Sequence, residues 1–220
     1  MTDAIATTTP ATGRVVEVDH PLVRHKLTLL RRVECDTAQF RSLVEELANL
    51  LTYEATKDLE TETIEIETPM ARMQGTAVSG KKVAVVPILR AGLGMVDGVL
   101  RMVPVARIGH LGMYRDEETL EAVTYFEKFP DDMAHRDVLL LDPMLATGGS
   151  VTVAVDQVKK AGAKHIKLLA ILAAPEGIAR LQADHPDVDI YVAGIDERLN
   201  EKGYIMPGLG DAGDRLFGTK

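Results

Sequence analysis

Short apolar runs separated by helix-like stretches occupy most of the chain from residue 83 onward. The runs cover residues 83–88, 105–113, 138–141, 168–173 and 188–193. Each is long enough for a strand whose two faces are both buried, and the stretches between them carry apolar residues three and four positions apart. Strands that alternate with helices predict an α/β fold, in which a parallel β-sheet is flanked by helices.

The first eighty residues follow a different pattern. Asp36 or Thr37 can cap a helix with an apolar stripe from Phe40 to Leu51. In residues 61–80, isoleucines alternate with acidic residues and glycines follow, which predicts an antiparallel β-hairpin arm outside the main sheet. We expect residues 1–15 to be a flexible tail and residues 16–220 to form one domain.

Composition narrows the classes of function. The chain has 220 residues, a net charge of −8 and a single cysteine, Cys35. An acidic chain with no Lys/Arg run argues against nucleic acid as a partner, and no apolar run approaches the length of a membrane span. The lone cysteine cannot form an intramolecular disulfide, which favours a reducing, cytoplasmic setting, and the first residues lack the pattern of a signal peptide.

The segment 138–150, VLLLDPMLATGGS, carries the clearest candidate chemistry. Asp142 follows an apolar strand directly, and ligands of open α/β sheets bind at the carboxyl ends of the strands. Thr147, the two glycines after it and Ser150 then open a predicted helix, whose amino terminus can bind a phosphate. The alternative is a plain strand-to-helix turn with Asp142 as a cap. The segment lacks the lysine of a GxxxxGK[ST] loop and the spacing of GxGxxG.

Two arginines also follow predicted strands. Arg90 precedes the glycine-rich stretch 91–94, and Arg115 comes after the run 105–113. A guanidinium matches the geometry of phosphate oxygens, although a surface arginine needs no ligand. The six histidines show no metal-ligand spacing, so the residues predict no protein metal site.

At five blocks the chain resembles the type I phosphoribosyltransferases, and among them the uracil phosphoribosyltransferase family of bacterial type. The blocks are VVPILRAGLGM at 85–95, GMYR at 112–115, DPMLATGGS at 142–150, AAPEGI at 173–178 and GYIMPGLGDAGDRLFGTK at 203–220. The resemblance implies transfer of ribose 5-phosphate from 5-phospho-α-D-ribosyl 1-diphosphate (PRPP) to N1 of uracil, which yields UMP and diphosphate in pyrimidine salvage.

The resemblance also implies roles for individual residues. Catalytic roles fall on Asp142, Asp211 and Arg115. PRPP would be bound by Arg90, Arg115, Asp142, Pro143, Met144, Leu145, Ala146, Thr147, Gly148, Gly149, Ser150 and Asp211. Uracil would be bound by Ile205, Gly210, Asp211 and Ala212, within a hood segment at 200–214.

Further expectations follow from the family. Pro143 stands where many relatives have a second acid, so Mg²⁺ would be held mainly by PRPP and diphosphate. In the family, the loop at Arg90 often contains a non-proline cis peptide, which the sequence itself does not show. Residues 116–128 would form a mobile loop over the reacting centre. A homodimer or larger homo-oligomer is expected, with the 61–80 arm as a candidate contact. GTP is an effector of some members.

Two other functions fit the same fold. One is a transcriptional regulator that binds UMP and RNA, which would require a basic RNA-binding face. The other is a catalytically silent sugar-phosphate sensor, which would have lost Asp142, Arg90 or Arg115. All three residues are present.

Overall fold

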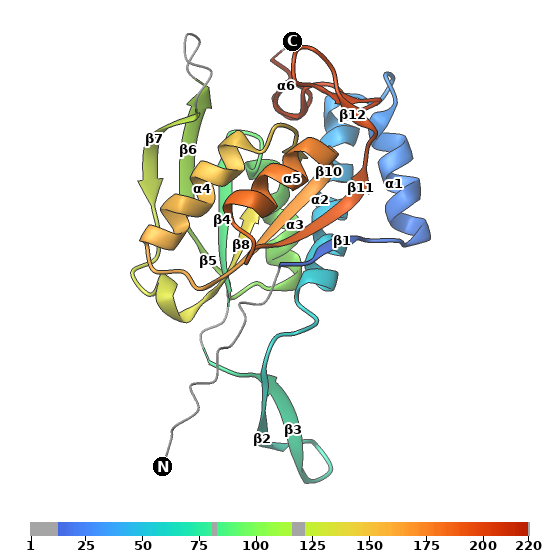
Figure 1. The fold of residues 1–220 in the computed structure, drawn as a ribbon. Helices are drawn as coiled ribbons and strands as arrows, with labels where there is room; N and C mark the ends of the chain where they lie inside the picture. Colours follow the sequence, from blue (N-terminus) through green and yellow to red (C-terminus); the bar gives the residue numbers. More distant parts are fainter. Residues whose placement is uncertain (1–12, 81–82, 116–121, 220) are drawn as a thin grey trace, which may run out of the picture.

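A β-sheet in which most strands are parallel forms the centre of the molecule (Figure 1). The computed structural model describes residues 13–80, 83–115 and 122–219. The strand order is β1-β11-β10-β8-β4-β6-β7, with β5 paired to β4 and β9 paired to β10. Among the described strands of this sheet, β7 is the one that runs antiparallel to its neighbour. The predicted α/β class is therefore confirmed.

The elements have the following bounds. The strands of the main sheet are β1 (Val15–Glu17), β4 (Val83–Leu89), β5 (Arg107–Ile108), β6 (His110–Arg115), β7 (Ala122–Lys128), β8 (Asp137–Leu141), β9 (Met144–Leu145), β10 (His165–Ala173) and β11 (Asp189–Ile195). The helices are α1 (Pro21–Arg31), α2 (Thr37–Ala55), α3 (Leu93–Met102), α4 (Gly149–Lys160), α5 (Pro175–Asp184) and α6 (Ala212–Phe217). Two separate antiparallel pairs are β2 (Thr61–Glu67) with β3 (Arg72–Val78), and β12 (Arg198–Leu199) with β13 (Ile205–Met206).

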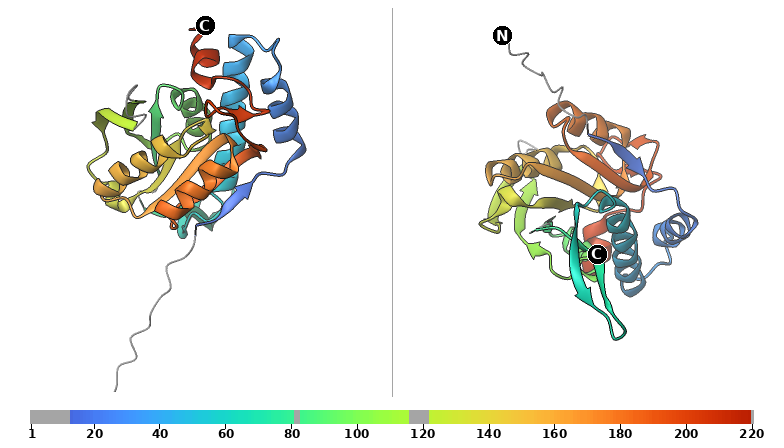
Figure 2. Two further views of the ribbon diagram at one scale, coloured as in Figure 1. Left: turned by 45° about the horizontal axis from the view of Figure 1, so that its top comes forward. Right: turned by 90° about the horizontal axis from the view of Figure 1, so that it is seen from below.

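Both faces of the sheet are covered by helices, which explains its continuous apolar runs (Figures 1 and 2). Successive residues of a strand point to opposite faces. Val83 and Val85 of β4 therefore pack in one core with α1, α2, α3 and α6, whereas Ala84 and Val86 pack in the other with α4 and α5. Burial on both sides fixes the sheet, and with it the loops at the carboxyl ends of its strands.

The predicted run 105–113 is wrong as a single strand. It divides into β5 and β6, which both pair with β4. Val105 lies outside either strand and is 85% exposed, because a turn closed by the amide of Ala106 donating to the carbonyl of Val103 follows helix α3. Gly109 separates the two strands while its amide still donates to the carbonyl of Val85, at 2.9 Å.

The predicted mobile loop 116–128 also needs correction. Its second half is strand β7, which pairs with β6 from Ala122 opposite Arg115 to Lys128 opposite His110. Val123 and the residues that follow it are β-branched or aromatic, and such residues favour a pleated strand over a solvated loop. Residues 116–121 lie outside the described part of the chain.

The hairpin β2–β3 projects away from the body of the molecule, as the sequence predicts (Figure 1). Its apolar side chains at Ile64, Ile66, Met70 and Met73 are exposed. At the amino terminus, the predicted tail 1–15 is shorter than expected. Val15 already belongs to β1 and pairs with Ile190, because burial against β11 orders the chain there; residues 1–12 lie outside the described part.

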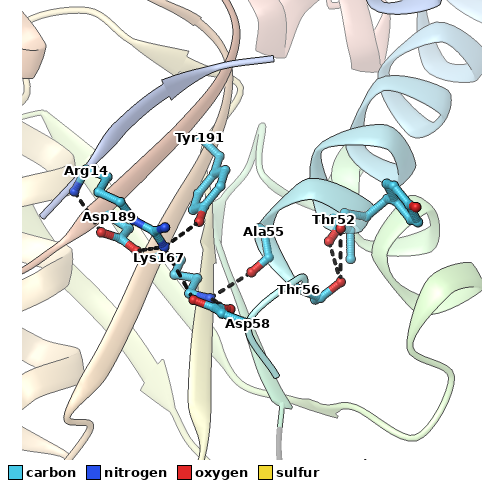
Figure 3. A network of polar contacts seen from close by, with 9 residues as sticks. Arg14, Thr52, Ala55, Thr56, Asp58, Lys167, Asp189 and Tyr191 are labelled. Atoms are coloured by element: carbon cyan, nitrogen blue, oxygen red, sulfur yellow. Dashed lines mark hydrogen bonds and ion pairs between the residues drawn. The ribbon is translucent and has the colours of Figure 1, made fainter. Parts of the chain in front are cut away.

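A polar network joins the end of helix α2 to the amino end of the sheet (Figure 3). Lys167 is nearly buried in β10, where its Nζ donates to the carbonyl of Ala55 at 2.7 Å and bonds the carboxylate of Asp58. Arg14 bonds Asp189 and Tyr191 beside it. This network secures the sheet at the edge opposite the predicted ligand site.

No helix within residues 13–80, 83–115 and 122–219 combines the length and the hydrophobicity needed to cross a bilayer.

Candidate active site

The loops after three neighbouring strands meet at the carboxyl edge of the sheet. Strands β4, β8 and β10 end at Leu89, Leu141 and Ala173. The loop after β4 lies directly on the end of β8, since a Cβ built on Gly92 would lie only 2.4 Å from the carbonyl oxygen of Leu141. Glycine is therefore required there, and the close approach brings the Arg90 loop beside Asp142.

Residues 142–150 line a cavity of about 490 Å³ at this edge. The predicted residues that line it are Asp142, Met144, Ala146, Thr147, Gly148, Gly149 and Ser150. Pro143 and Leu145 lie behind them: the carbonyl of Pro143 accepts from the amides of Ile171 and Leu172, and Leu145 pairs with Ala173. These bonds to β10 hold the loop in place.

The glycine turn presents the amino terminus of helix α4 to the cavity. Gly148 has φ of 77°, a left-handed conformation that favours glycine, and Gly149 begins the helix. Thr147 turns its hydroxyl toward the amide of Gly149, 3.5 Å away. The first amides of a helix have no partner within it, so this terminus can bind an anion.

Asp142 stands on the wall of the same cavity. Its Oδ1 accepts from the amide of Met144 at 3.2 Å, so the side chain does form a local turn, the alternative weighed from the sequence. Although its surface remains partly exposed, burial by the surrounding chain raises the pKa of Asp142 to about 7, against the smaller, opposing effect of that hydrogen bond. A carboxyl with this pKa in a cleft is a candidate for chemistry.

Arg90 is exposed at the end of β4, and its guanidinium lies 5.7 Å from the ring centroid of Phe217 in α6. The peptide bond between Leu89 and Arg90 is cis, as the family resemblance implied. Arg115 is the last residue of β6; its side chain lies outside the described part of the chain.

The segment expected to bind uracil comprises strand β13, the turn that follows it and the start of helix α6. Ile205 is buried in strand β13, and Gly210 has φ of 83°. Asp211 is exposed and caps helix α6, where its Oδ1 accepts from the amide of Asp214 at 2.8 Å. Ala212 is the first, buried residue of that helix. Asp211 thus has a structural role as a helix cap, and its role in binding stays a prediction.

Two contacts bring this segment to the other loops. A Cβ on Gly203 would lie 3.5 Å from the methyl carbon of Thr147, and one on Gly213 would lie 4.0 Å from the Cβ of Ala91. Gly203 also lines the cavity. The hood segment therefore reaches the predicted phosphate turn through Gly203, whereas Gly210 and Asp211 line a separate cavity of about 640 Å³ together with Arg31 and Cys35.

Sequence reasoning missed an ion pair that lies behind the uracil segment. Arg31 donates to both oxygens of Asp196, at 2.7 and 2.5 Å, and to the carbonyl of Gly208 at 2.9 Å. Asp196, whose side chain is 5% exposed, also accepts from the amide of Gly208. On the other side, Arg215 donates to the carbonyls of Leu30 and Leu209. The loop is thus held by charge-assisted hydrogen bonds.

Sequence reasoning also missed Arg180, which lines the cavity from helix α5. The available signal was its place in the second turn of a helix that follows the carboxyl end of β10, shortly after the block AAPEGI. Position on one helix did not reveal that the side chain reaches the loop between β8 and α4.

The donor set of the cavity fits a magnesium ion carried by a phosphate substrate. Asp142 is the one carboxylate among the described residues that line it. Within residues 13–80, 83–115 and 122–219, no cluster of three or more His, Cys, Asp or Glu could hold a metal ion by itself. Mg²⁺ commonly binds through one or two carboxylates together with substrate phosphates and water.

Comparisons with known proteins agree on one family. The family model for uracil phosphoribosyltransferase matches residues 16–219. A uracil phosphoribosyltransferase of Clostridium botulinum strain Eklund 17B is 60% identical over 94% of this chain and all of its own length, and one of Bacillus cytotoxicus is 56% identical over the same shares. A solved protein structure from Aquifex aeolicus is 41% identical, covers 94% of this chain and 99% of its own, and superposes with a TM-score of 0.89. The chain therefore belongs to the uracil phosphoribosyltransferase family.

Proposed function

We propose that this enzyme transfers the 5-phosphoribosyl group from PRPP to N1 of uracil and releases UMP and diphosphate. The observation that carries the proposal is the approach of the hood segment 200–214 to both loops at the carboxyl edge of the sheet. A Cβ on its Gly203 would lie 3.5 Å from Thr147 of the turn 147–150, and one on its Gly213 would lie 4.0 Å from Ala91 of the Arg90 loop. A phosphorylated sugar and a flat base fit this pairing.

In the reaction, the bond between C1 of the ribose and the diphosphate oxygen breaks, and a bond from C1 to N1 of uracil forms. The proton of N1 is released. Positive charge develops on the sugar and negative charge on the leaving diphosphate, so the two need opposite partners. Asp142 would accept hydrogen bonds from the ribose hydroxyls and face the developing cation, while Arg90 and Arg115 would bind the diphosphate.

The base would be read by the backbone. Uracil offers two carbonyl acceptors and an N3 donor, which amides and carbonyls at Ile205, Gly210 and Ala212 can match. Cytosine carries a donor in place of the C4 carbonyl, which would leave an amide unpaired and cause strong discrimination. Asp211 would contact PRPP and orient the base; as the cap of α6, it is held in one position by the amide of Asp214.

Several further assignments belong to the same proposal. Mg²⁺, when bound with PRPP, would neutralise charge on the diphosphate, and Asp142, the one carboxylate among the described residues that line the cavity, could help to hold it. The protein would form a homodimer or larger homo-oligomer in the cytoplasm. The β2–β3 arm is the candidate contact, since its apolar side chains, among them Ile64 and Met73, are exposed. GTP as an effector rests on the family alone.

The transcriptional-regulator alternative is not supported, since the relatives at high identity are enzymes by name over nearly their full length. The net charge of −8 also disfavours an RNA-binding face.

The deciding assay follows UMP formation from radiolabelled uracil with PRPP and Mg²⁺, with cytosine, orotate and hypoxanthine as competing bases. We expect UMP with uracil and no product with the other three. Folded protein that forms no UMP would refute the proposal. A mobility-shift assay with pyrimidine-operon leader RNA serves as the matched test of the regulator alternative, and we expect no shift.

A further inference from the structure

The side chain of Arg180 lies across the glycine turn that begins helix α4. A Cβ built on Gly149 would lie 3.2 Å from a guanidinium nitrogen of Arg180, and one built on Gly148 would lie 3.3 Å from the Cβ of Arg180 and 3.4 Å from its Cδ. The aliphatic stem thus passes Gly148, and the charged head reaches Gly149. Larger residues at these two positions would crowd the arginine.

Arg180 brings positive charge to the cavity. Among the described residues that line the cavity, Arg180 is the one with a cationic side chain. Its guanidinium forms an ion pair with Asp184, one turn further along α5, at 3.9 Å. The side chain of Arg180 is 52% exposed and that of Asp184 is 47% exposed. An exposed pair at this distance contributes little, so the guanidinium can turn to a stronger acceptor at small cost.

The amino terminus of α4 supplies the other half of an anion site. The cavity is lined by Thr147 and Ser150 where helix α4 begins, and by Arg180 from helix α5. A dianion between them would accept from backbone amides on one side and from a planar guanidinium on the other. Arginine suits this role because its fork of donors matches two phosphate oxygens.

We propose that Arg180 binds the 5-phosphate of the substrate and product, alongside the turn 147–150. This inference rests on the proposed function, since it names a further residue for the same ligand. The 5-phosphate lies at the end of the ribose away from the bond that breaks. Its interaction with Arg180 is therefore equal in the ground state and the transition state, and it sets affinity and not the rate of the chemical step.

The experiment compares wild type with Arg180→Gln, Arg180→Lys and the control Arg101→Gln. Arg101 is likewise an exposed arginine that pairs with one carboxylate, Glu45, but it lies at the far end of α3. Each protein is characterised by its steady-state kinetics with PRPP, by calorimetric titration with UMP, by inhibition with diphosphate, and by thermal unfolding.

We expect Arg180→Gln to raise the KM for PRPP and the Kd for UMP about tenfold, which corresponds to about 1.4 kcal/mol. The kcat, the KM for uracil and the inhibition constant of diphosphate should stay within about twofold of wild type, because none of them reports the 5-phosphate. Arg180→Lys should recover part of the affinity, and Arg101→Gln should behave as wild type.

The inference is overturned if Arg180→Gln binds UMP and PRPP as wild type does. It is equally overturned if affinity for diphosphate falls as much as affinity for UMP, because Arg180 would then act on the whole site or on the leaving group. The proposed function fails by a different result, the absence of UMP formation by wild-type protein.

Discussion

Replacing Asp142 by asparagine should stabilise the ligand-free protein near neutral pH even though it impairs turnover. Asparagine keeps an oxygen that can accept from the amide of Met144, the one hydrogen bond to the Asp142 side chain that opposes its raised pKa. What it removes is the negative charge in a site that burial makes unfavourable for that charge.

The pKa shift sets the size and sign of the effect. Burial raises the pKa of Asp142 from 3.8 to about 7, and a shift of about three units corresponds to a ceiling of about 4 kcal/mol. Because the carboxyl is partly exposed to the cavity, we expect about 1–2 kcal/mol in practice. The folded protein holds this proton more tightly than the unfolded chain. The stability that this proton contributes is therefore fully present below about pH 4 and is lost as the pH rises to about 7.

The assay is urea unfolding of wild-type protein and Asp142→Asn at pH 5, 6, 7 and 8 without ligands. The difference between the two free energies of unfolding cancels every other titrating group. It should grow by about 1 kcal/mol in favour of the variant between pH 5 and 8, most of it below pH 7. For Asp142→Ala, the difference in free energy of unfolding should change with pH in the same way. It should be less favourable to the variant at every pH, since alanine also loses the hydrogen bond from the amide of Met144. A difference that is flat with pH, or that shrinks, would refute the reasoning.

The same variant tests the role of Asp142 in the reaction. We expect kcat/KM for PRPP to fall about 10- to 100-fold at neutral pH, since a neutral amide cannot stabilise positive charge on the ribose. A stable variant with full activity would remove Asp142 from the proposed mechanism and leave it as a turn residue.

Three further substitutions test the base segment and the frame. Gly210→Val should raise the KM for uracil at least about tenfold with PRPP affinity retained in calorimetry, because φ of 83° costs a β-branched residue about 1–2 kcal/mol. Arg31→Gln should lower the free energy of unfolding by about 2–3 kcal/mol and raise the KM for uracil, because the buried carboxylate of Asp196 loses its partner. Lys167→Met should lower stability in urea by about 1–3 kcal/mol without changing either KM, since the carbonyl of Ala55 loses its donor far from the site.

Each of these has a result that contradicts it. Equal loss of uracil and PRPP binding in Gly210→Val would make the glycine a residue of general stability. For Arg31, the control is Arg31→Lys, which keeps a charge but not the two-pronged contact; if Gln and Lys behave as wild type, the pair does not hold the loop. A changed KM in Lys167→Met would mean that the polar network at the amino edge reaches the site.

The pattern of apolar residues along the chain was sufficient to predict the inner strands of the sheet and the turn that follows one of them. The apolar runs that became β4, β8, β10 and β11 could be read because burial on both faces leaves a continuous hydrophobic signature. Asp142 and the turn 147–150 could be located because they follow the apolar run that became β8. The family followed from short blocks whose residue types match phosphosugar chemistry.

Lys167 shows where pattern is insufficient. It interrupts the apolar run of β10, yet it is buried, because the carbonyl of Ala55 and the carboxylate of Asp58 satisfy its charge (Figure 3). Strand β7 was missed because it lies at the end of the sheet, paired with β6, and its half-exposed residues lack the continuous apolar run of the inner strands.

The sequence by itself determined the fold class, the position of the glycine turn 147–150 at the start of a helix, and the family of the chain. Tertiary structure alone decided which distant side chains complete the site. Arg31 and Asp196 are 165 positions apart, and Arg180 reaches Gly149 from another helix. Such contacts depend on how strands are ordered and helices are packed over them, and the spacing of residues along the chain carries no record of that order.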